Sequence, residues 1–187
     1  EWRDSYRALS EAPRDQLATG DLERLAVAAY MIGEDLDAVA GWDEAHRRHL
    51  EAGQRAEAAR CAFWAALCLM MQGRMAHAGG WLSRAEGIIG ADLDCAASGY
   101  LLIPALLGAL ESDDASGAHD LALQATEIAE RCDDADLAAL AALGRGQALL
   151  ALGRAAEGLA RLDEVMLSVT AGEVGPIAAG IVYCAVI

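Results

Sequence analysis

The sequence predicts an all-α protein, a right-handed α-solenoid of stacked helix hairpins with a period of 40 residues. The first observation is the period itself: Gly33, Gly73, Asp113 and Gly153 follow one another in steps of 40 residues. The second is the composition, because 55% of the residues are hydrophobic, many of them alanine, and only one is Phe. The third is the scarcity of helix breakers, with three prolines in 187 residues. Repeats of this length are typical of solenoids, in which each unit needs its neighbours to bury its apolar face.

The same register holds at three further positions of the unit. Five, nine and twelve residues after the turn position, small or apolar side chains recur in every copy. They are Ala38, Ala78, Ala118 and Gly158; Trp42, Leu82, Ala122 and Leu162; and Ala45, Ala85, Ala125 and Val165. Residues 1–5 align with residues 41–45, so the repeat already includes the first residues of the chain.

Each helix is expected from its apolar spacing and from the turn residues beside it. Trp2, Tyr6 and Leu9 are spaced as on one helix face, and Gly33 takes the usual role of a glycine that ends a helix. The expected helices cover residues 1–12, 22–32, 36–50, 55–72, 75–88, 92–111, 116–131, 135–152, 155–169 and 177 onward. Pro104 lies deep in one of them, so we expect a kink or a late helix start there.

Paired in order, these helices form one array of four complete units, with an incomplete unit at each end. The complete units span residues 21–53, 54–90, 91–132 and 135–170, and the incomplete ones span residues 1–12 and 175–187. Solenoids normally end in polar caps, and the apolar residues 181–187 form no such cap. We therefore expect the chain to be a piece of a larger protein.

The formal net charge is −15, and all 14 basic residues are arginine. Such an acidic surface repels phosphate, which argues against direct nucleic-acid contact by this segment. Two interpretations of the charge stay open: it keeps the protein in solution, or it attracts a basic partner. Lysine and asparagine, which have A/T-rich codons, are absent, and this indicates a GC-rich bacterial source.

Five cysteines stand at positions 61, 68, 95, 132 and 184, and none of them forms a CxxC pair. Cysteine fits small helical faces as a compact hydrophobic residue, so we expect free thiols in a reducing, cytoplasmic compartment. No apolar run reaches the roughly 18 residues of a membrane helix, so we expect no membrane contact.

Two units carry the order small–Gly–Ala–aromatic–Ala or a close variant of it. The residues are Gly33, Ala38, Trp42 and Ala45, then Gly73, Ala78, Leu82 and Ala85. This pattern resembles the second helix of the tetratricopeptide repeat (TPR), and the resemblance covers nearly the whole chain, with departures at Asp113 and Gly158. The period exceeds the usual length of about 34 residues, which implies second helices longer by one or two turns.

Three stretches are similar to the helical-repeat region of large actinobacterial regulators of the LuxR type. They are residues 59–64, 79–85 and 143–149. Such regulators often carry an ATPase domain before the repeats and a helix-turn-helix after them. The resemblance implies that this segment is the sensing or interaction arm of a transcriptional regulator, because no helix with a basic recognition face occurs in it.

The TPR resemblance also implies a binding surface, since the first helices of TPR units line the concave face of the array. Carried over by register, that surface is mostly apolar, and Arg60 is its one basic member. The candidate binding residues are Glu23, Tyr30, Met31, Arg60, Phe63, Leu67, Met70, Met71, Tyr100 and Gln147. This row favours a protein or peptide with an apolar segment, or alternatively a small apolar effector. The competing interpretation is that these side chains pack inside a tightly wound superhelix.

His46 and His49 are spaced to share a helix face, where a metal ion would need a third ligand. Candidates for that ligand are Asp43, Glu44 and Cys61. The neighbouring Arg47 and Arg48 oppose a cation, so we expect a solvated helix face and no metal. Cys61 and Cys68 are expected to be buried.

The acidic pairs 113–114 and 133–134 are expected to cap helices. No Walker loop, GxSxG elbow or other catalytic pattern occurs, so we expect no cofactor and no enzymatic activity. The sequence thus favours a non-enzymatic interaction or sensor module. A stand-alone TPR adaptor and an effector-binding domain are the alternatives, and the apolar ends make a homo-oligomer plausible.

Overall fold

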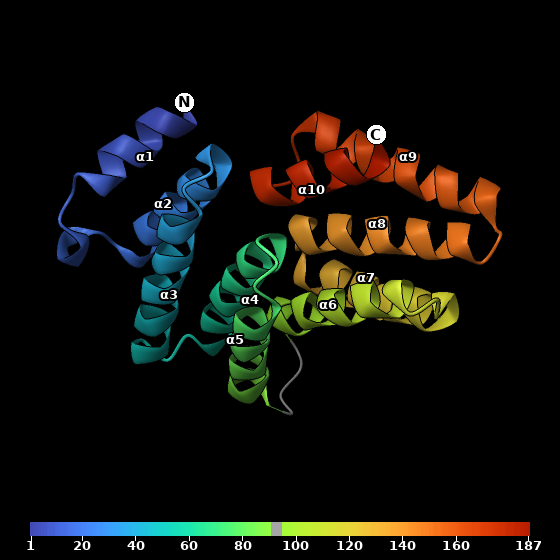
Figure 1. Ribbon diagram of the computed structural model, residues 1–187, viewed down its shortest axis with the longest axis horizontal. Helices are drawn as coiled ribbons and strands as arrows, with labels where there is room; N and C mark the ends of the chain where they lie inside the picture. The colour runs from blue at the N-terminus through green and yellow to red at the C-terminus, as the bar shows by residue number, and fades with distance from the viewer. Residues whose placement is uncertain (91–94) are drawn as a thin grey trace. The chain divides into compact units, whose positions relative to one another are not determined.

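The computed structural model describes residues 1–90 and 95–187 (Figure 1). Within these residues the chain forms ten α-helices, one short 3-10 helix and no strand, which confirms the all-α prediction. None of the described helices is long and apolar enough to cross a bilayer. The helices fall into two compact units, unit 1 (residues 1–93) and unit 2 (residues 94–187).

Unit 1 is a succession of helices in which each packs against the next. They are α1 (Trp2–Ser10), η1 (Arg14–Gln16), α2 (Thr19–Ile32), α3 (Asp35–Glu51), α4 (Arg55–Met71) and α5 (Met75–Ile89). Neighbouring helices pair as hairpins, α2 with α3 and α4 with α5, while α1 packs on α2. The hydroxyl of Tyr6 also donates a hydrogen bond to Asp37, which attaches α1 to α3.

Unit 2 repeats the same arrangement. Its helices are α6 (Ala96–Glu111), α7 (Ala115–Cys132), α8 (Ala135–Ala151), α9 (Ala155–Ala171) and α10 (Pro176–Val186). Besides the hairpin contacts, α6 packs on α8 and α8 packs on α10, so the first helices of successive hairpins touch. This stacking of hairpins is the packing of an α-helical repeat solenoid.

The expected helices are found, with shifts at their ends. Helix α2 begins at Thr19, earlier than expected, and residues 92–94 of another expected helix lie outside the described residues. Helix α6 runs through Pro104, so the late start proposed for this proline is wrong. The extra residues of the 40-residue repeat are not confined to the second helix of each hairpin. The first helix α4 has 17 residues and the second helix α5 has 15.

The repeat register is confirmed by the backbone at the turns. Gly33, Gly73 and Gly153 have φ angles of 82°, 72° and 76°, in the left-handed region that glycine enters without strain. Asp113 occupies the equivalent turn with a φ of 58°. The same local conformation therefore recurs every 40 residues, even where the glycine is missing.

The recurring positions of the second helices face inward. Trp42 is 3% exposed, and Leu162 and Val165 are 7% and 4% exposed. The corresponding alanines are buried in all copies that carry them, while Leu82 is half-buried. Small residues at these positions let the two helices of a hairpin lie close together.

The acidic residues at the turns do cap helices, as expected. Asp114 Oδ1 accepts a hydrogen bond from the Gly117 amide at 2.9 Å, and Asp134 Oδ1 accepts one from the Leu137 amide at 2.9 Å. Each carboxylate satisfies an amide that the first turn of a helix leaves without an intrahelical partner.

Candidate functional site

The candidate binding row on α4 divides between core and surface. Phe63 and Leu67 are 0% and 4% exposed, so they are core side chains with no surface to offer a partner. Met70 is half-buried and packs against a buried cluster from α4 and α5. Met71 is 62% exposed. The two methionines therefore do not form the shared exposed pair that their adjacency in the sequence suggests.

The other candidates of unit 1 lie at the edge of the core. Glu23, Tyr30 and Met31 on α2 and Arg60 on α4 are all half-buried. The structure brings two of them together, because Arg60 Nη2 lies 3.2 Å from Glu23 Oε2. Binding by these residues stays a prediction.

In unit 2 the candidate residue Tyr100 is a buried core residue. It is 2% exposed, and its hydroxyl donates to Asp134 Oδ1 at 2.8 Å, the same oxygen that caps α8. Gln147 is half-buried on α8. Tyr100 thus joins α6 to the start of α8, and a partner cannot reach it in this structure.

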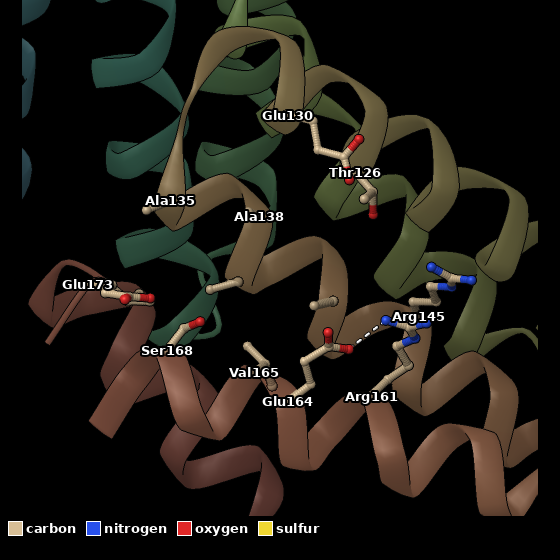
Figure 2. Close-up of a pocket in the computed structure, with 13 residues that line it drawn as sticks. Thr126, Glu130, Ala135, Ala138, Arg145, Arg161, Glu164, Val165, Ser168 and Glu173 are labelled. Carbon is tan, nitrogen blue, oxygen red and sulfur yellow. Dashed lines mark hydrogen bonds and ion pairs between the residues drawn. The ribbon is translucent and has the colours of Figure 1, made fainter. Parts of the chain in front are cut away.

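A pocket of about 360 Å³ lies elsewhere in unit 2, between α7, α8 and α9. Its lining is mostly small or apolar on α8 and mixed on the two flanking helices (Figure 2). The lining residues are Thr126, Glu130, Ala135, Ala138, Ala139, Ala142, Arg145, Arg161, Glu164, Val165, Ser168, Glu173 and Val174. We call this pocket the α8 groove. None of its residues belongs to the candidate row.

The α8 groove has opposite charges at its two ends. Arg145 and Arg161 lie together at one end, whereas Glu173 lies at the other end, beside the first turn of α8 (Figure 2). Ten residues of helix separate the positions 135 and 145, which corresponds to about 15 Å along the axis. Arg161 is paired with Glu164. Arg145 Nε, by contrast, is buried and has no hydrogen-bond partner among the described residues.

Two buried glycines on either side of Arg145 set its position. A Cβ on Gly144 would lie 2.6 Å from Leu106 of α6, and one on Gly146 would lie 2.6 Å from Leu162 of α9. A Cβ at either position would force the facing leucine side chain to shift, so glycine favours the close approach of α8 to both neighbours. The sequence contains a signal for this site, a single arginine between two glycines in an alanine- and leucine-rich helix.

The expectation of a solvated face at His46 and His49 is wrong. They are 1% and 7% exposed, because α3 packs between α2 and α4. His46 Nδ1 lies 2.8 Å from the Ala58 carbonyl oxygen, and the ring meets Trp81 edge-on at 5.3 Å between centroids. The carbonyl can only accept, so Nδ1 carries the proton.

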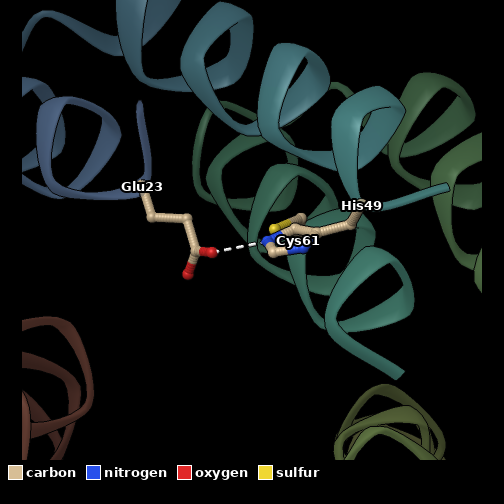
Figure 3. A group of neighbouring side chains, drawn as sticks. All are labelled: Glu23, His49 and Cys61. Carbon is tan, nitrogen blue, oxygen red and sulfur yellow. Dashed lines mark hydrogen bonds and ion pairs between the residues drawn. The ribbon is translucent and has the colours of Figure 1, made fainter. Parts of the chain in front are cut away.

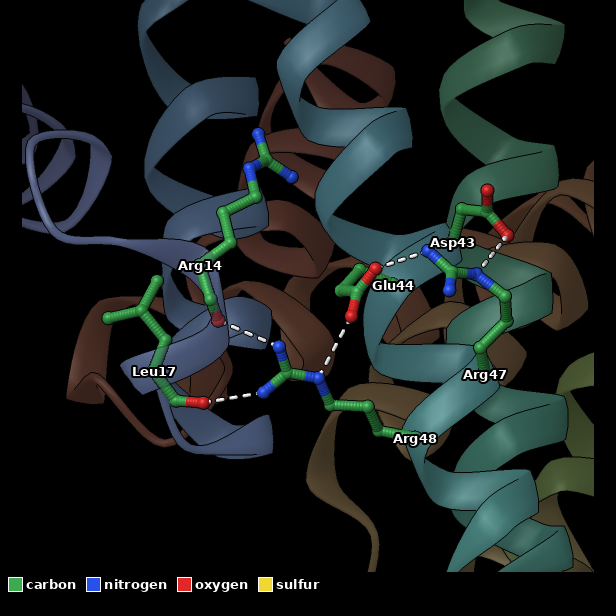
Figure 4. Close-up of polar contacts among 6 residues, drawn as sticks. All are labelled: Arg14, Leu17, Asp43, Glu44, Arg47 and Arg48. Atoms are coloured by element: carbon green, nitrogen blue, oxygen red, sulfur yellow. Dashed lines mark hydrogen bonds and ion pairs between the residues drawn. The ribbon is translucent and has the colours of Figure 1, made fainter.

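The arginines beside these histidines point to other groups. Arg47 pairs with Asp43 and Glu44 (Figure 4). Arg48 donates to Glu44 Oε1 at 2.9 Å and to the carbonyl oxygen of Leu17 at 2.5 Å. Both guanidinium groups are therefore paired with carboxylates of α3, and Arg48 also binds the segment before α2.

The burial of Cys61 and Cys68 is confirmed, with exposed fractions of 0% and 1%. None of the five cysteines, all of which lie among the described residues, forms a disulfide. Burial raises the pKa of the Cys61 thiol, and it raises that of Cys68 to about 12. Neither is an activated thiolate.

A scan against protein-family models finds no match for this sequence, and a search of curated proteins finds no significant relative.

Proposed function

We propose that the chain is a non-enzymatic binding module whose α8 groove receives a short peptide segment of a protein partner. The segment would have apolar side chains and one carboxylate. The observation that carries this proposal is Arg145, whose buried Nε has no hydrogen-bond partner among the described residues. A buried donor without an acceptor costs roughly 1–3 kcal/mol, so its presence in a groove is explained best by an acceptor that arrives with a ligand.

The lining of the groove supports the choice of ligand. The α8 wall consists of alanines, which leave room for apolar side chains, and the arginine end suits a carboxylate. Glu173, at the other end, suits a donor such as a peptide amide or an amino group. By the resemblance to the repeats of LuxR-type regulators, we propose that the module is the TPR-like interaction arm of a cytoplasmic transcriptional regulator; a stand-alone adaptor is the alternative.

A second candidate function is an effector domain for a small apolar acid. The volume of about 360 Å³ favours it, because pockets for small molecules start at about 300 Å³. In that case medium-chain fatty acids or aryl carboxylic acids should raise the thermal midpoint of the purified chain. At about 100 times the dissociation constant the expected stabilisation is roughly 2.7 kcal/mol.

The peptide proposal is tested by selecting binders from a phage-displayed random peptide library. Enriched peptides should contain apolar residues and a carboxylate, and calorimetry then gives their affinities. Arg145→Met keeps the aliphatic stem and removes the donor. We expect it to weaken binding about 10- to 100-fold, which corresponds to one charge-assisted hydrogen bond, and to leave the free energy of unfolding unchanged or higher.

Arg154→Met is the matched control, because Arg154 lies in the same unit, is exposed, pairs with Glu157 and does not line the groove. Its effect on affinity should stay within about twofold, as expected of a surface ion pair. Equal affinities for wild type and Arg145→Met would contradict the proposal.

A further inference from the structure

Three consecutive helices of unit 1 bring a carboxylate, an imidazole and a thiol to one point. Glu23 comes from α2, His49 from α3 and Cys61 from α4 (Figure 3). One ligand atom of each, a carboxylate oxygen, a ring nitrogen and the sulfur, lies within 4.8 Å of the other two. His49 and Cys61 are buried and Glu23 is half-buried, so the cluster sits at the edge of the core.

The hydrogen bonds of His49 leave one nitrogen facing this cluster. Nδ1 lies 2.8 Å from Gln54 Oε1, and Nε2 lies 2.7 Å from Glu23 Oε1. In the tautomer that carries the proton on Nδ1, this nitrogen donates to the Gln54 amide oxygen and the lone pair of Nε2 faces the cluster. The short contact between Nε2 and Glu23 Oε1 can be bridged by a proton on Nε2 or, in the other tautomer, by a metal ion. Metal-binding histidines are oriented in this way, with the second nitrogen donating to a carbonyl or carboxylate oxygen.

We propose that Glu23, His49 and Cys61 form a binding site for a divalent transition-metal ion, with Zn²⁺ as its best fit. Nitrogen, sulfur and carboxylate oxygen are the three ligand types of protein zinc sites. Zinc–ligand bonds of about 2.0–2.3 Å place tetrahedral ligands about 3.3–3.8 Å apart. The observed spacing therefore needs small side-chain adjustments only, and the fourth position stays open to water.

The charges around the cluster are compatible with such an ion. Metal binding would release the Cys61 thiol proton to solvent, and the resulting thiolate and the Glu23 carboxylate would together offset both charges of Zn²⁺. Arg60 Nη2 lies 3.2 Å from Glu23 Oε2, so it holds the second carboxylate oxygen while Oε1 faces His49. Arg47 and Arg48 bind the carboxylates and carbonyls shown in Figure 4. These two arginines therefore do not compete with a metal ion for the Glu23 carboxylate.

The site would join α2, α3 and α4 through one ion, because each helix contributes one ligand. Unit 1 should then become more stable when the metal binds. This consequence is independent of the α8 groove, since all three ligands belong to unit 1.

The test is titration of the chelator-treated chain with Co²⁺ and Zn²⁺. Cobalt bound by a thiolate shows a sulfur-to-metal charge-transfer band in the near ultraviolet and intense visible bands when it is tetrahedral. We expect both bands to saturate at one Co²⁺ per chain, Zn²⁺ to displace them, and the thermal midpoint to rise with Zn²⁺. Absence of the charge-transfer band in the wild type would overturn the proposal.

Variants locate the ion. Cys61→Ala should abolish the charge-transfer band, whereas Cys68→Ala, the loss of an equally buried thiol seven residues further along α4, should retain it. If the charge-transfer band is lost or retained in both variants alike, the assignment of Cys61 as the ligand is wrong.

If Cys61→Ala fails to fold, Gln54→Ala still tests the proposal, because Gln54 is exposed at the N-cap position of α4. Loss of the residue that orients the ligating histidine should weaken Zn²⁺ binding about 10- to 100-fold while the helical circular dichroism persists. Unchanged affinity in Gln54→Ala would also overturn the assignment.

Discussion

Single glycines decide how closely neighbouring helices of this chain approach one another. Gly41 of α3 faces α2, where a Cβ would lie 2.9 Å from Ala26 Cβ and 3.2 Å from Ala26 Cα. The second contact is to backbone, so a rotamer change cannot relieve it. Gly158 of α9 is similar, since a Cβ there would lie 2.9 Å from the Gly146 carbonyl oxygen. These positions require glycine for space, whereas the turn glycines require it for backbone conformation.

Gly41→Ala should therefore lower the free energy of unfolding by about 1–3 kcal/mol, the usual cost of overpacking a close helix contact. Urea denaturation followed by circular dichroism measures the change. Gly80→Ala on α5 is the control, because a Cβ there meets nothing within 4 Å. It should raise stability by up to about 1 kcal/mol through helix propensity alone. A stabilising Gly41→Ala would contradict the close approach of α2 and α3.

One carboxylate, Glu44, pairs with the arginine that connects helix α3 to the segment before α2. The hydrogen bond from Arg48, and the nearby charges of Arg47 and Arg48, hold the pKa of Glu44 below its ordinary value of 4.5. A lowered folded-state pKa contributes stability above the unfolded pKa and loses it as the pH falls through the folded value.

We therefore expect stability to fall more steeply below pH 4.5 in the wild type than in Glu44→Gln. Since the group is partly exposed, the difference should be at most about 1 kcal/mol. Guanidinium denaturation across this acidic range measures it. Arg48→Met should reduce the same pH dependence. If the stability of the wild type falls with pH as it does in both variants, the Glu44–Arg48 pair contributes nothing to stability.

At the scale of helices and turns, the repeat shows itself as one conformation with exchangeable residues. The turns at positions 73 and 113 are equivalent, yet one holds glycine and the other aspartate. A residue with a Cβ costs roughly 1–2 kcal/mol in the left-handed region, less for aspartate, which tolerates it better than most.

Reciprocal exchange tests this equivalence. Asp113→Gly should stabilise the chain and Gly73→Asp should destabilise it, each by about 1 kcal/mol or less. Thermal and urea unfolding of both variants give the two values. Changes of the same sign would mean that the two turns are not equivalent.

Local sequence features were enough to predict the helices, their turns and the capping role of Asp114 and Asp134. Each depends on spacing or on backbone conformation within a few residues. The burial of His46 and His49 could not be predicted in this way, because it depends on which helices flank α3. Their partners, such as the Ala58 carbonyl and Glu23, lie on other helices.

The candidate site shows the same limit. The register placed the candidate row on the first helices, but it could not tell that Phe63, Leu67 and Tyr100 are buried. Nor could it foresee a groove flanked by two second helices, because that groove depends on the spacing of α7, α8 and α9. The flanking glycines of Arg145 were visible in the sequence, but their meaning required the neighbouring Leu106 and Leu162.

For the molecule as a whole, the net charge of −15 limits which ligands can bind. Most arginines with a described ion pair neutralise a carboxylate close by in their own helix, as Arg24 does with Asp21 and Arg161 with Glu164. A strongly acidic ligand would be repelled by the rest of the surface. The basic end of the α8 groove therefore suits a mostly apolar ligand with a single carboxylate.

The most direct test of the proposed function is to map a selected peptide on the isotopically labelled chain by NMR. Backbone amide shifts on peptide titration should concentrate on α7, α8 and α9, with the largest changes around Arg145 and Ala142. They should be absent or strongly reduced in Arg145→Met. Shifts concentrated instead on the candidate row of unit 1, around the exposed Met71 and the half-buried Met31, would contradict the groove and place the binding surface on unit 1.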